Sequence, residues 1–286
     1  MAELLHCPHC EGALSVGSDG WVCRSCQFAS DGIDFRLQKP KQIQLGFVIG
    51  SKIDWQSRLE KIDTSRPVVS FAGPNGKRDS RELLSVVKDA TEHLGILLDL
   101  GCGPRDQQVP VESLGHRYVG VDYSSKDANY LADAHALPFR DASFDFVLSY
   151  AVFEHLYNPF AAIAQVERVL KPGGLFVGTV SLGEPFHESF FHHSAWGLIS
   201  LLDSSHELEI VRLWSALDTL RSLSRMGRYS RPIRSALGWL DAVNRRMPWL
   251  SPRKARRPIK EKQVDALHRC GSIAFVVRKK ERKNDV

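Results

Sequence analysis

The chain has 286 residues, of which 43% are hydrophobic and 25% are charged, a composition typical of a globular protein with room for one large and one small domain. It has no run of about 18 apolar residues, and its first residues form no apolar signal core, so we expect a cytoplasmic protein without a transmembrane segment. The net charge of +5 is uneven, because residues 221–262 contain 13 Lys and Arg against two acidic residues.

Two Cys-x2-Cys pairs stand at the N-terminus, formed by Cys7, Cys10, Cys23 and Cys26. Clustered cysteines in a reducing compartment indicate a metal site, and four thiolates can hold one Zn²⁺ tetrahedrally. The residues between the pairs predict a hairpin. We therefore expect a structural zinc ribbon over residues 1–38, whose small core needs the metal for stability. His6 and His9 flank the first pair, and we expect them to be exposed neighbours rather than ligands.

Residues 39–78 are expected to form a linker with an N-terminal helical segment, and residues 79–286 a larger domain. A helix follows Asp79-Ser80, with Leu83, Val87 and Leu94 on one apolar face. Apolar segments then predict strands at 96–100, 117–124, 144–150 and 173–181, and a helix begins at Asn158. Strands that alternate with helices predict a parallel, doubly wound α/β sheet, whose ligands bind beyond the carboxyl ends of the strands.

The loop after the first of these strands contains Gly101 and Gly103, but Asp106 stands where a dinucleotide-binding loop has its third glycine. A pyrophosphate needs backbone N–H donors and no nearby anion. Pro104 lacks an N–H group, and Asp99 adds negative charge at the strand end. Such a loop suits a nucleoside ligand with a cationic group, and S-adenosylmethionine with its sulfonium is such a ligand.

Two further acids are expected at strand ends. Asp122 ends the second strand, where an acid is placed to accept hydrogen bonds from ribose hydroxyls. A short third strand is expected between the strands at 117–124 and 144–150, and Asp133 follows it, placed to accept from the adenine amino group. Together with Asp99, these acids form one group at the ligand-binding edge of the predicted sheet.

The segments LLDLGCGPR, YVGVDYS, ADAHALPFRDASFDFVLSYAVFEHL and ERVLKPGGLFVGTV resemble the class I S-adenosylmethionine-dependent methyltransferases of the broad type-11 kind, over about residues 80–182. The resemblance implies that Gly101 and Gly103 line the methionine portion of the cofactor and that Asp122 binds its ribose. It also implies that Asp133 and Ala134 face the adenine and that Tyr150 lies beside the methionine end.

The same family implies a seven-stranded Rossmann-like sheet with one antiparallel edge strand. Residues 270–279 fit that edge strand, and residues 206–214 fit the strand before it. The N-terminal cysteines followed by residues 29–37 are similar to zinc-ribbon domains that accompany methyltransferases, either fused or as separate activator subunits. A basic helical insertion is expected at about 215–268.

The methyl acceptor is not named by the sequence. Candidate general bases are His155, after the fourth strand, and His187 and His193, after the fifth. No Asn-Pro-Pro-Tyr clamp occurs, which disfavours methylation of an adenine or glutamine nitrogen. An acceptor that is a small molecule, a sugar or a lipid-linked glycan is the first interpretation.

The basic residues 221–262 leave other interpretations open. They indicate an anionic partner, either RNA or a membrane surface to which the protein attaches peripherally, or else a solvated face of an ordinary substrate cap. An RNA methyltransferase that uses the ribbon and this segment to bind RNA is therefore an alternative. A non-catalytic S-adenosylmethionine-binding partner protein is another.

Overall fold

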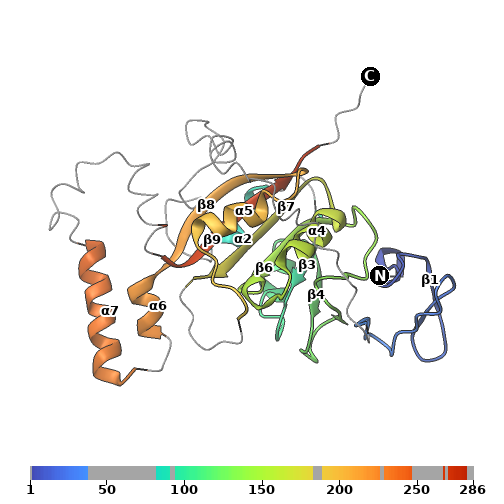
Figure 1. The fold of residues 1–286 in the computed structure, drawn as a ribbon, viewed down its shortest axis with the longest axis horizontal. Helices are drawn as coiled ribbons and strands as arrows, with labels where there is room; N and C mark the ends of the chain where they lie inside the picture. Colours follow the sequence, from blue (N-terminus) through green and yellow to red (C-terminus); the bar gives the residue numbers. More distant parts are fainter. Residues whose placement is uncertain are drawn as a thin grey trace, which may run out of the picture.

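The structure is a computed structural model that describes residues 2–37, 82–90, 94–182, 189–225, 229–246, 267 and 270–281. The segment expected at 39–78 and the candidate base His187 lie outside these residues. The strands of the central sheet follow the order β5 (Tyr130–Leu131), β4 (Arg117–Asp122), β3 (Ile96–Leu100), β6 (Phe144–Tyr150), β7 (Leu170–Ser181), β9 (Cys270–Lys279) and β8 (Leu208–Asp218). The predicted seven-stranded, Rossmann-like α/β sheet is confirmed (Figure 1).

The strands from β5 to β7 are parallel, and β9 is antiparallel to both of its neighbours. The antiparallel strand was expected at the edge of the sheet, and this is wrong, because β9 lies between β7 and β8. Ile273 to Val277 form an unbroken run of buried apolar residues, which needs cover on both faces and pairing on both sides. The edge strand on this side of the sheet is β8, which carries exposed Glu209 and half-buried Arg212.

Helices cover both faces of the sheet. Besides the central strands, the apolar core of one face contains residues of α4 (Pro159–Val169) and α5 (Ala195–Leu202), and the core of the other contains residues of α2 (Glu82–Asp89) and α3 (Gln108–Ser113). Helix α2 ends earlier than its apolar periodicity predicts, and Leu94 beyond it is exposed. None of the helices in the described part of the chain has the length and apolarity needed to cross a bilayer.

Helix α4 shows how local sequence fixes an element that leads into the sheet. The side chain of Asn158 accepts a hydrogen bond from the Ala161 N–H, and Pro159 occupies the first helical position, where no N–H is needed. Strand β7 then begins directly at Leu170, before the Pro-Gly-Gly that was expected to separate helix and strand.

The N-terminal module contains a 3-10 helix, η1 (Ala2–Leu4), and the hairpin of β1 (Leu14–Val16) and β2 (Trp21–Cys23). It packs against the β5 end of the sheet: the Phe35 N–H donates to the Leu131 carbonyl at 2.8 Å, and the Leu131 N–H donates to the Ile33 carbonyl at 3.0 Å. Leu5 and Phe35 are fully buried in the same apolar core as the central strands. The module and the sheet therefore share one core.

This shared core predicts a large loss of stability for Phe35→Ala. Removing a fully buried Phe side chain costs about 3–5 kcal/mol of the free energy of unfolding, because Phe35 is 0% exposed. Urea denaturation followed by circular dichroism measures this loss. Phe190→Ala is the matched control, because Phe190 is 65% exposed. Equal stability of the two variants would show that the module does not contribute to the core of the domain.

Candidate functional site

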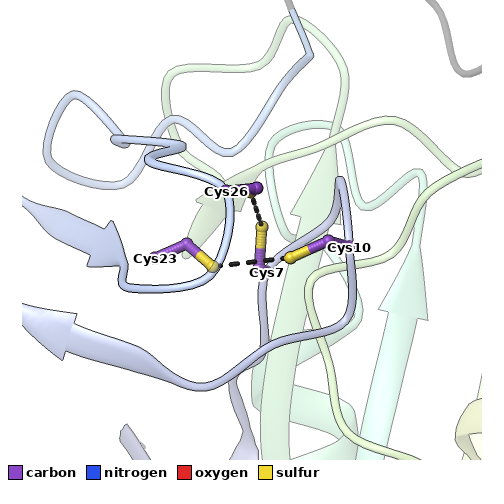
Figure 2. A group of neighbouring side chains, drawn as sticks. All are labelled: Cys7, Cys10, Cys23 and Cys26. Carbon is purple, nitrogen blue, oxygen red and sulfur yellow. Dashed lines mark hydrogen bonds between the residues drawn. The ribbon is translucent and has the colours of Figure 1, made fainter.

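Four cysteine side chains converge within the N-terminal module (Figure 2). The Sγ atoms of Cys7, Cys10, Cys23 and Cys26 all lie within 4.8 Å of one another. The Cys7–Cys26 and Cys10–Cys23 sulfur pairs are 3.6 and 3.5 Å apart. Zn–S bonds of about 2.3 Å in a tetrahedron place sulfurs about 3.8 Å apart. The cluster therefore has the size that one zinc ion with four thiolate ligands requires.

The two cysteine pairs form turns of the same geometry. The Glu11 N–H donates to the Cys7 carbonyl at 2.8 Å, and the Gln27 N–H donates to the Cys23 carbonyl at 3.0 Å. Glu11 and Gln27 both have a φ of 62°, a left-handed conformation that few residues other than glycine adopt. Neither residue is a glycine, so the sequence carried no signal for this repeated turn.

His6 and His9 differ in their surroundings. His9 is exposed as expected, but His6 is buried, and its Nε2–H donates to the Leu137 carbonyl at 3.0 Å. Burial and the positive charge of Arg168 lower the pKa of His6. The expectation of an exposed His6 is therefore wrong, because the first cysteine turn lies against the sheet domain.

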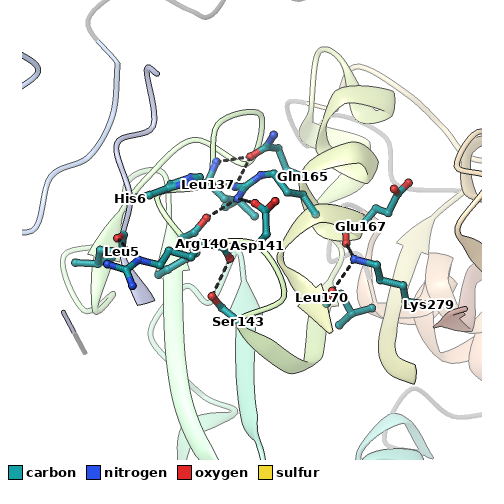
Figure 3. A network of polar contacts seen from close by, with 12 residues as sticks. Leu5, His6, Leu137, Arg140, Asp141, Ser143, Gln165, Glu167, Leu170 and Lys279 are labelled. Carbon is teal, nitrogen blue, oxygen red and sulfur yellow. Dashed lines mark hydrogen bonds and ion pairs between the residues drawn. The ribbon is translucent and has the colours of Figure 1, made fainter. Parts of the chain in front are cut away.

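A polar network joins this module to the loop that precedes β6 (Figure 3). The Arg140 N–H donates to the Leu4 carbonyl at 2.7 Å, and the Arg140 Nε–H donates to the Leu5 carbonyl at 3.3 Å. From the other side, Arg168 of α4 donates to the carbonyls of Phe139 and Leu137. The loop that receives the module is thus held by a helix of the sheet domain.

The glycine loop after β3 has two glycines with different functions. A Cβ at Gly101, whose φ is +76°, would lie 2.3 Å from a methyl group of Val152, so packing requires this glycine. A Cβ at Gly103, whose φ is +50°, would meet no atom within 4 Å. Arg105 also has a positive φ of 61°. The loop therefore curls sharply at the carboxyl edge of the sheet and leaves open space beside Gly103.

The carboxylate of Asp122, at the end of β4, ties this loop to the next strand. Its Oδ2 accepts a hydrogen bond from the Gly103 N–H at 2.9 Å. Its Oδ1 accepts from the N–H groups of Ser124 and Ser125 at 2.8 and 2.9 Å. Burial raises the pKa of Asp122, but these hydrogen bonds outweigh it and the pKa lies below its usual value. The Ser124 hydroxyl also donates to Oδ1 at 3.5 Å, whereas Oδ2 accepts only from Gly103 among the described residues and keeps one acceptor position.

Asp99 is a buried acid on β3, beside the glycine loop. It is 2% exposed, and the Tyr118 hydroxyl donates to its Oδ2 at 2.7 Å. Burial is the main cause that raises the pKa of Asp99 to about 6; the hydrogen bond from Tyr118 opposes this shift, and the nearby charge of Asp122 adds to it. The carboxyl of Asp99 is therefore ionised at neutral pH but takes up a proton in mild acid.

Asp133 is oriented by a residue that the sequence analysis missed. The Oδ1 of Asp133 accepts from the N–H and from Nδ1 of His135, at 2.9 and 2.5 Å. The Asn158 N–H donates to Nε2 of His135 at 3.3 Å, so the ring proton lies on Nδ1. Burial raises the pKa of Asp133, but the hydrogen bonds from His135 outweigh burial, and the pKa lies below its usual value. The Asp-Ala-His sequence could have indicated this contact, because it places a histidine two residues after the acid.

The other candidates occupy the same rim. Tyr150 ends β6 and is half-buried, and Ala134 is 8% exposed. Since β3 to β6 are parallel, their carboxyl ends bring Asp99, Asp122, Asp133 and Tyr150 to one edge of the sheet.

The described candidate bases differ in environment. His155 is half-buried in the 3-10 helix η2 (Phe153–His155). His193 is 6% exposed, and burial lowers its pKa more than a hydrogen bond to the Phe153 backbone raises it. Its Nε2 has no hydrogen-bond partner among the described residues.

Glu154, which sequence reasoning did not single out, holds the segment that carries His193. It is fully buried, and its Oε1 accepts from the Ser181 N–H at 3.0 Å. Its carbonyl accepts from the N–H groups of Phe190 and Phe191. The sequence around Glu154 does not indicate that its side chain and backbone join these segments, because Ser181 and Phe190 lie far from Glu154 along the chain.

Comparison with known proteins identifies the central region. Residues 98–178 match the family described as a methyltransferase domain. An uncharacterized methyltransferase of Mycobacterium marinum is 36% identical over 118 residues, which are 35% of this chain and 46% of that protein. The ubiquinone biosynthesis O-methyltransferase of Maricaulis maris is 33% identical over 97 residues, which are 28% of this chain and 38% of that protein.

Among solved structures, phosphoethanolamine N-methyltransferase 2 of Haemonchus contortus, in complex with S-adenosyl-L-methionine, is similar with a TM-score of 0.41 and 14% identity. The similarity covers 71% of this chain and 53% of that one.

The chain therefore contains a methyltransferase domain, and the matched region includes the glycine loop and the three acids. The resemblance of this region to S-adenosylmethionine-dependent methyltransferases is confirmed. The match spans less than half of the length of both curated relatives.

The cysteine cluster predicts one bound metal per chain. We expect about one equivalent of zinc, because four converging thiolates complete a tetrahedral site. Plasma emission spectrometry of the purified protein measures the metal. Cys10→Ser is expected to lower the zinc content to less than half, whereas Cys102→Ser, which alters a buried cysteine outside the cluster, is the control. A zinc content that is low in the wild type, or unchanged by Cys10→Ser, contradicts the assignment.

Proposed function

We propose that this protein is an S-adenosylmethionine-dependent methyltransferase whose acceptor is a small molecule, a sugar or a lipid-linked glycan. The observation that carries the proposal is the meeting of the glycine loop with Asp99, Asp122 and Asp133 at the carboxyl edge of the sheet. The match of residues 98–178 to the methyltransferase domain family supports it.

The residues at this edge fit the proposed cofactor. The open space beside Gly103 lets the backbone approach a nucleoside, and the remaining acceptor position of Asp122 can take a ribose hydroxyl. Since His135 occupies Oδ1 of Asp133, Oδ2 remains for the adenine amino group. Asp99 adds negative charge beside a cationic ligand. When bound, the cofactor supplies a sulfonium that is an effective methyl donor.

The chain's contribution to the chemistry is mainly alignment, because a bound and oriented acceptor reacts far faster than a free one. His193 is the best supported general base. Its lowered pKa keeps the imidazole neutral at pH 7, and its Nε2 has no partner among the described residues. Placed after the end of β7, it can take the proton that an acceptor hydroxyl loses. His155 and His187 remain further candidates.

We further propose that residues 1–38 form a structural zinc ribbon. Four thiolates leave the metal no open coordination position, so the ribbon is not expected to take part in catalysis. It contacts the proposed cofactor site through Arg36. The Arg36 guanidinium is fixed by Asp34, donates to the Tyr123 carbonyl at 3.1 Å and lies 5.6 Å from the Tyr123 ring centre. Since Tyr123 follows Asp122, the ribbon supports the nucleoside end of the site.

Asp122→Ala tests the cofactor site. We expect the variant to lose at least about 10-fold in affinity for S-adenosylmethionine, because both a ligand contact and the anchor of the Gly103 loop disappear. Isothermal titration calorimetry measures the affinity. Asp106→Ala is the control, because Asp106 is an exposed acid of the same loop. Unchanged affinity in Asp122→Ala contradicts the site assignment, and absence of binding to the wild type contradicts the function.

Methyl transfer from labelled S-adenosylmethionine into fractionated cell extract tests the acceptor class. Label in lipids, sugars or small metabolites supports the proposal, whereas label in RNA supports the alternative. Transfer should fall strongly in His193→Gln while binding of S-adenosylmethionine persists. Absence of transfer to every fraction, despite cofactor binding, favours a non-catalytic partner protein.

The raised pKa of Asp99 predicts a pH dependence of cofactor binding. A cationic ligand favours the ionised carboxyl, so affinity should increase by about 10-fold from pH 5 to pH 7 as Asp99 loses its proton, given its pKa of about 6. Calorimetry across this range measures the effect, and Asp99→Asn should abolish it. An equally steep dependence in Asp99→Asn would assign it to another group.

The same shift predicts a stability change in the ligand-free protein. Because the folded chain binds the Asp99 proton more tightly than the unfolded chain, the stabilisation is fully present below about pH 4 and is lost as pH increases through about 6. Asp99→Asn should therefore flatten this part of the pH profile of the free energy of unfolding.

A further inference from the structure

Two helices extend from the sheet at the end opposite to the N-terminal module (Figure 1). Helix α6 (Thr219–Arg225) follows β8 directly, and α7 (Arg231–Arg246) packs beside it, where the Arg234 Nε–H donates to the Ser224 carbonyl at 2.9 Å. Strand β8 runs in the same direction as β7, since both are antiparallel to β9. The two helices therefore leave the sheet at the edge that carries Asp99 and Asp122.

The apolar side of α7 faces outward. Ile233, Trp239 and Leu240 are 48%, 65% and 46% exposed. Ile233 and Leu240 are seven residues apart and lie on one face of the helix, and Trp239 lies on the side that adjoins this face. Buried Asp241 and half-buried Arg234 share another side of the helix, and on that side Arg234 donates to the Ser224 carbonyl of α6. A helix of a globular protein normally buries its apolar face, so the exposed face of α7 is expected to bind a partner.

The charge of the surrounding sequence indicates the chemistry of that partner. Residues 221–262 contain 13 Lys and Arg against two acidic residues, a net charge of +11. A second copy of this chain would bring two such segments together and repel them. RNA binding requires cations on the contact face, whereas the outward face of α7 is apolar. An anionic lipid surface accepts both features, since apolar side chains enter the headgroup region and basic residues pair with the headgroups.

We propose that α7 lies on the surface of an anionic membrane, with Ile233, Trp239 and Leu240 inserted among the headgroups. The carboxyl edge of the sheet then lies beside the bilayer. Taken together with the proposed function, on which this consequence rests, the placement selects a lipid-linked acceptor over a freely diffusing one.

Vesicle flotation of the full-length protein tests the proposal. Vesicles of phosphatidylcholine with phosphatidylglycerol should bind the protein, vesicles of phosphatidylcholine alone should bind it much less, and high salt should weaken binding. The double variant Trp239→Ser, Leu240→Ser should lower partitioning by at least about 10-fold, because it removes most of the inserted apolar area.

Trp196→Ser is the matched control, because Trp196 is also an exposed tryptophan, 49% exposed, but lies on α5. Affinity for S-adenosylmethionine should be unchanged in both variants, which separates loss of lipid binding from misfolding and from failure of the proposed function. Absence of vesicle binding, or binding that the double variant retains, overturns the proposal. Salt-sensitive RNA binding in place of vesicle binding, or self-association that the double variant abolishes, overturns it as well.

Discussion

The arrangement of the site depends on the hydrogen bonds that the Asp122 carboxylate accepts from three backbone N–H groups. They join the loop after β3 to the turn after β4, and so fix the space between two neighbouring strand ends. The negative charge is stabilised by these donors, which outweigh the effect of burial on the pKa. A carboxylate that is already held in place loses little further freedom when a ligand binds.

The N-terminal module covers an edge that the sheet alone would leave exposed. Strand β5 has two residues, and its outer side pairs with the backbone of Ile33 and Phe35. Unpaired strand edges favour association with other chains, and a covering segment prevents this. The module's own hairpin is short, so we expect the stability of the cover to depend on the metal proposed for the cysteine cluster. The Arg36–Tyr123 contact extends this dependence to the turn that Asp122 organises.

The sequence predicted the elements whose signal is local. The Cys-x2-Cys pairs, the buried strand before Gly101 and the Asn158-Pro159 helix start all depend on neighbouring residues, and the structure contains each of them. Prediction from the sequence failed where contacts between residues distant in the chain determine the structure. The inner position of β9 depends on a contact with β7 about a hundred residues away. Likewise, the burial of His6 requires the distant Leu137, and the orientation of Asp133 requires the backbone of Asn158.

Different segments of the chain lie at the two ends of the sheet, and this difference affects the side from which an acceptor can reach the site. At the β5 end, the N-terminal module pairs with the strand and covers that side of the sheet. This side lies next to Asp133, the acid proposed to bind the adenine. At the β8 end, the chain continues into α6 and α7 and presents apolar side chains outward. The side proposed to bind the nucleoside is thus covered by the chain itself, whereas the side near β7 and β8 borders the surface for which we propose a membrane partner. An acceptor held on that surface would approach His193 from the end of the sheet that the ribbon does not cover.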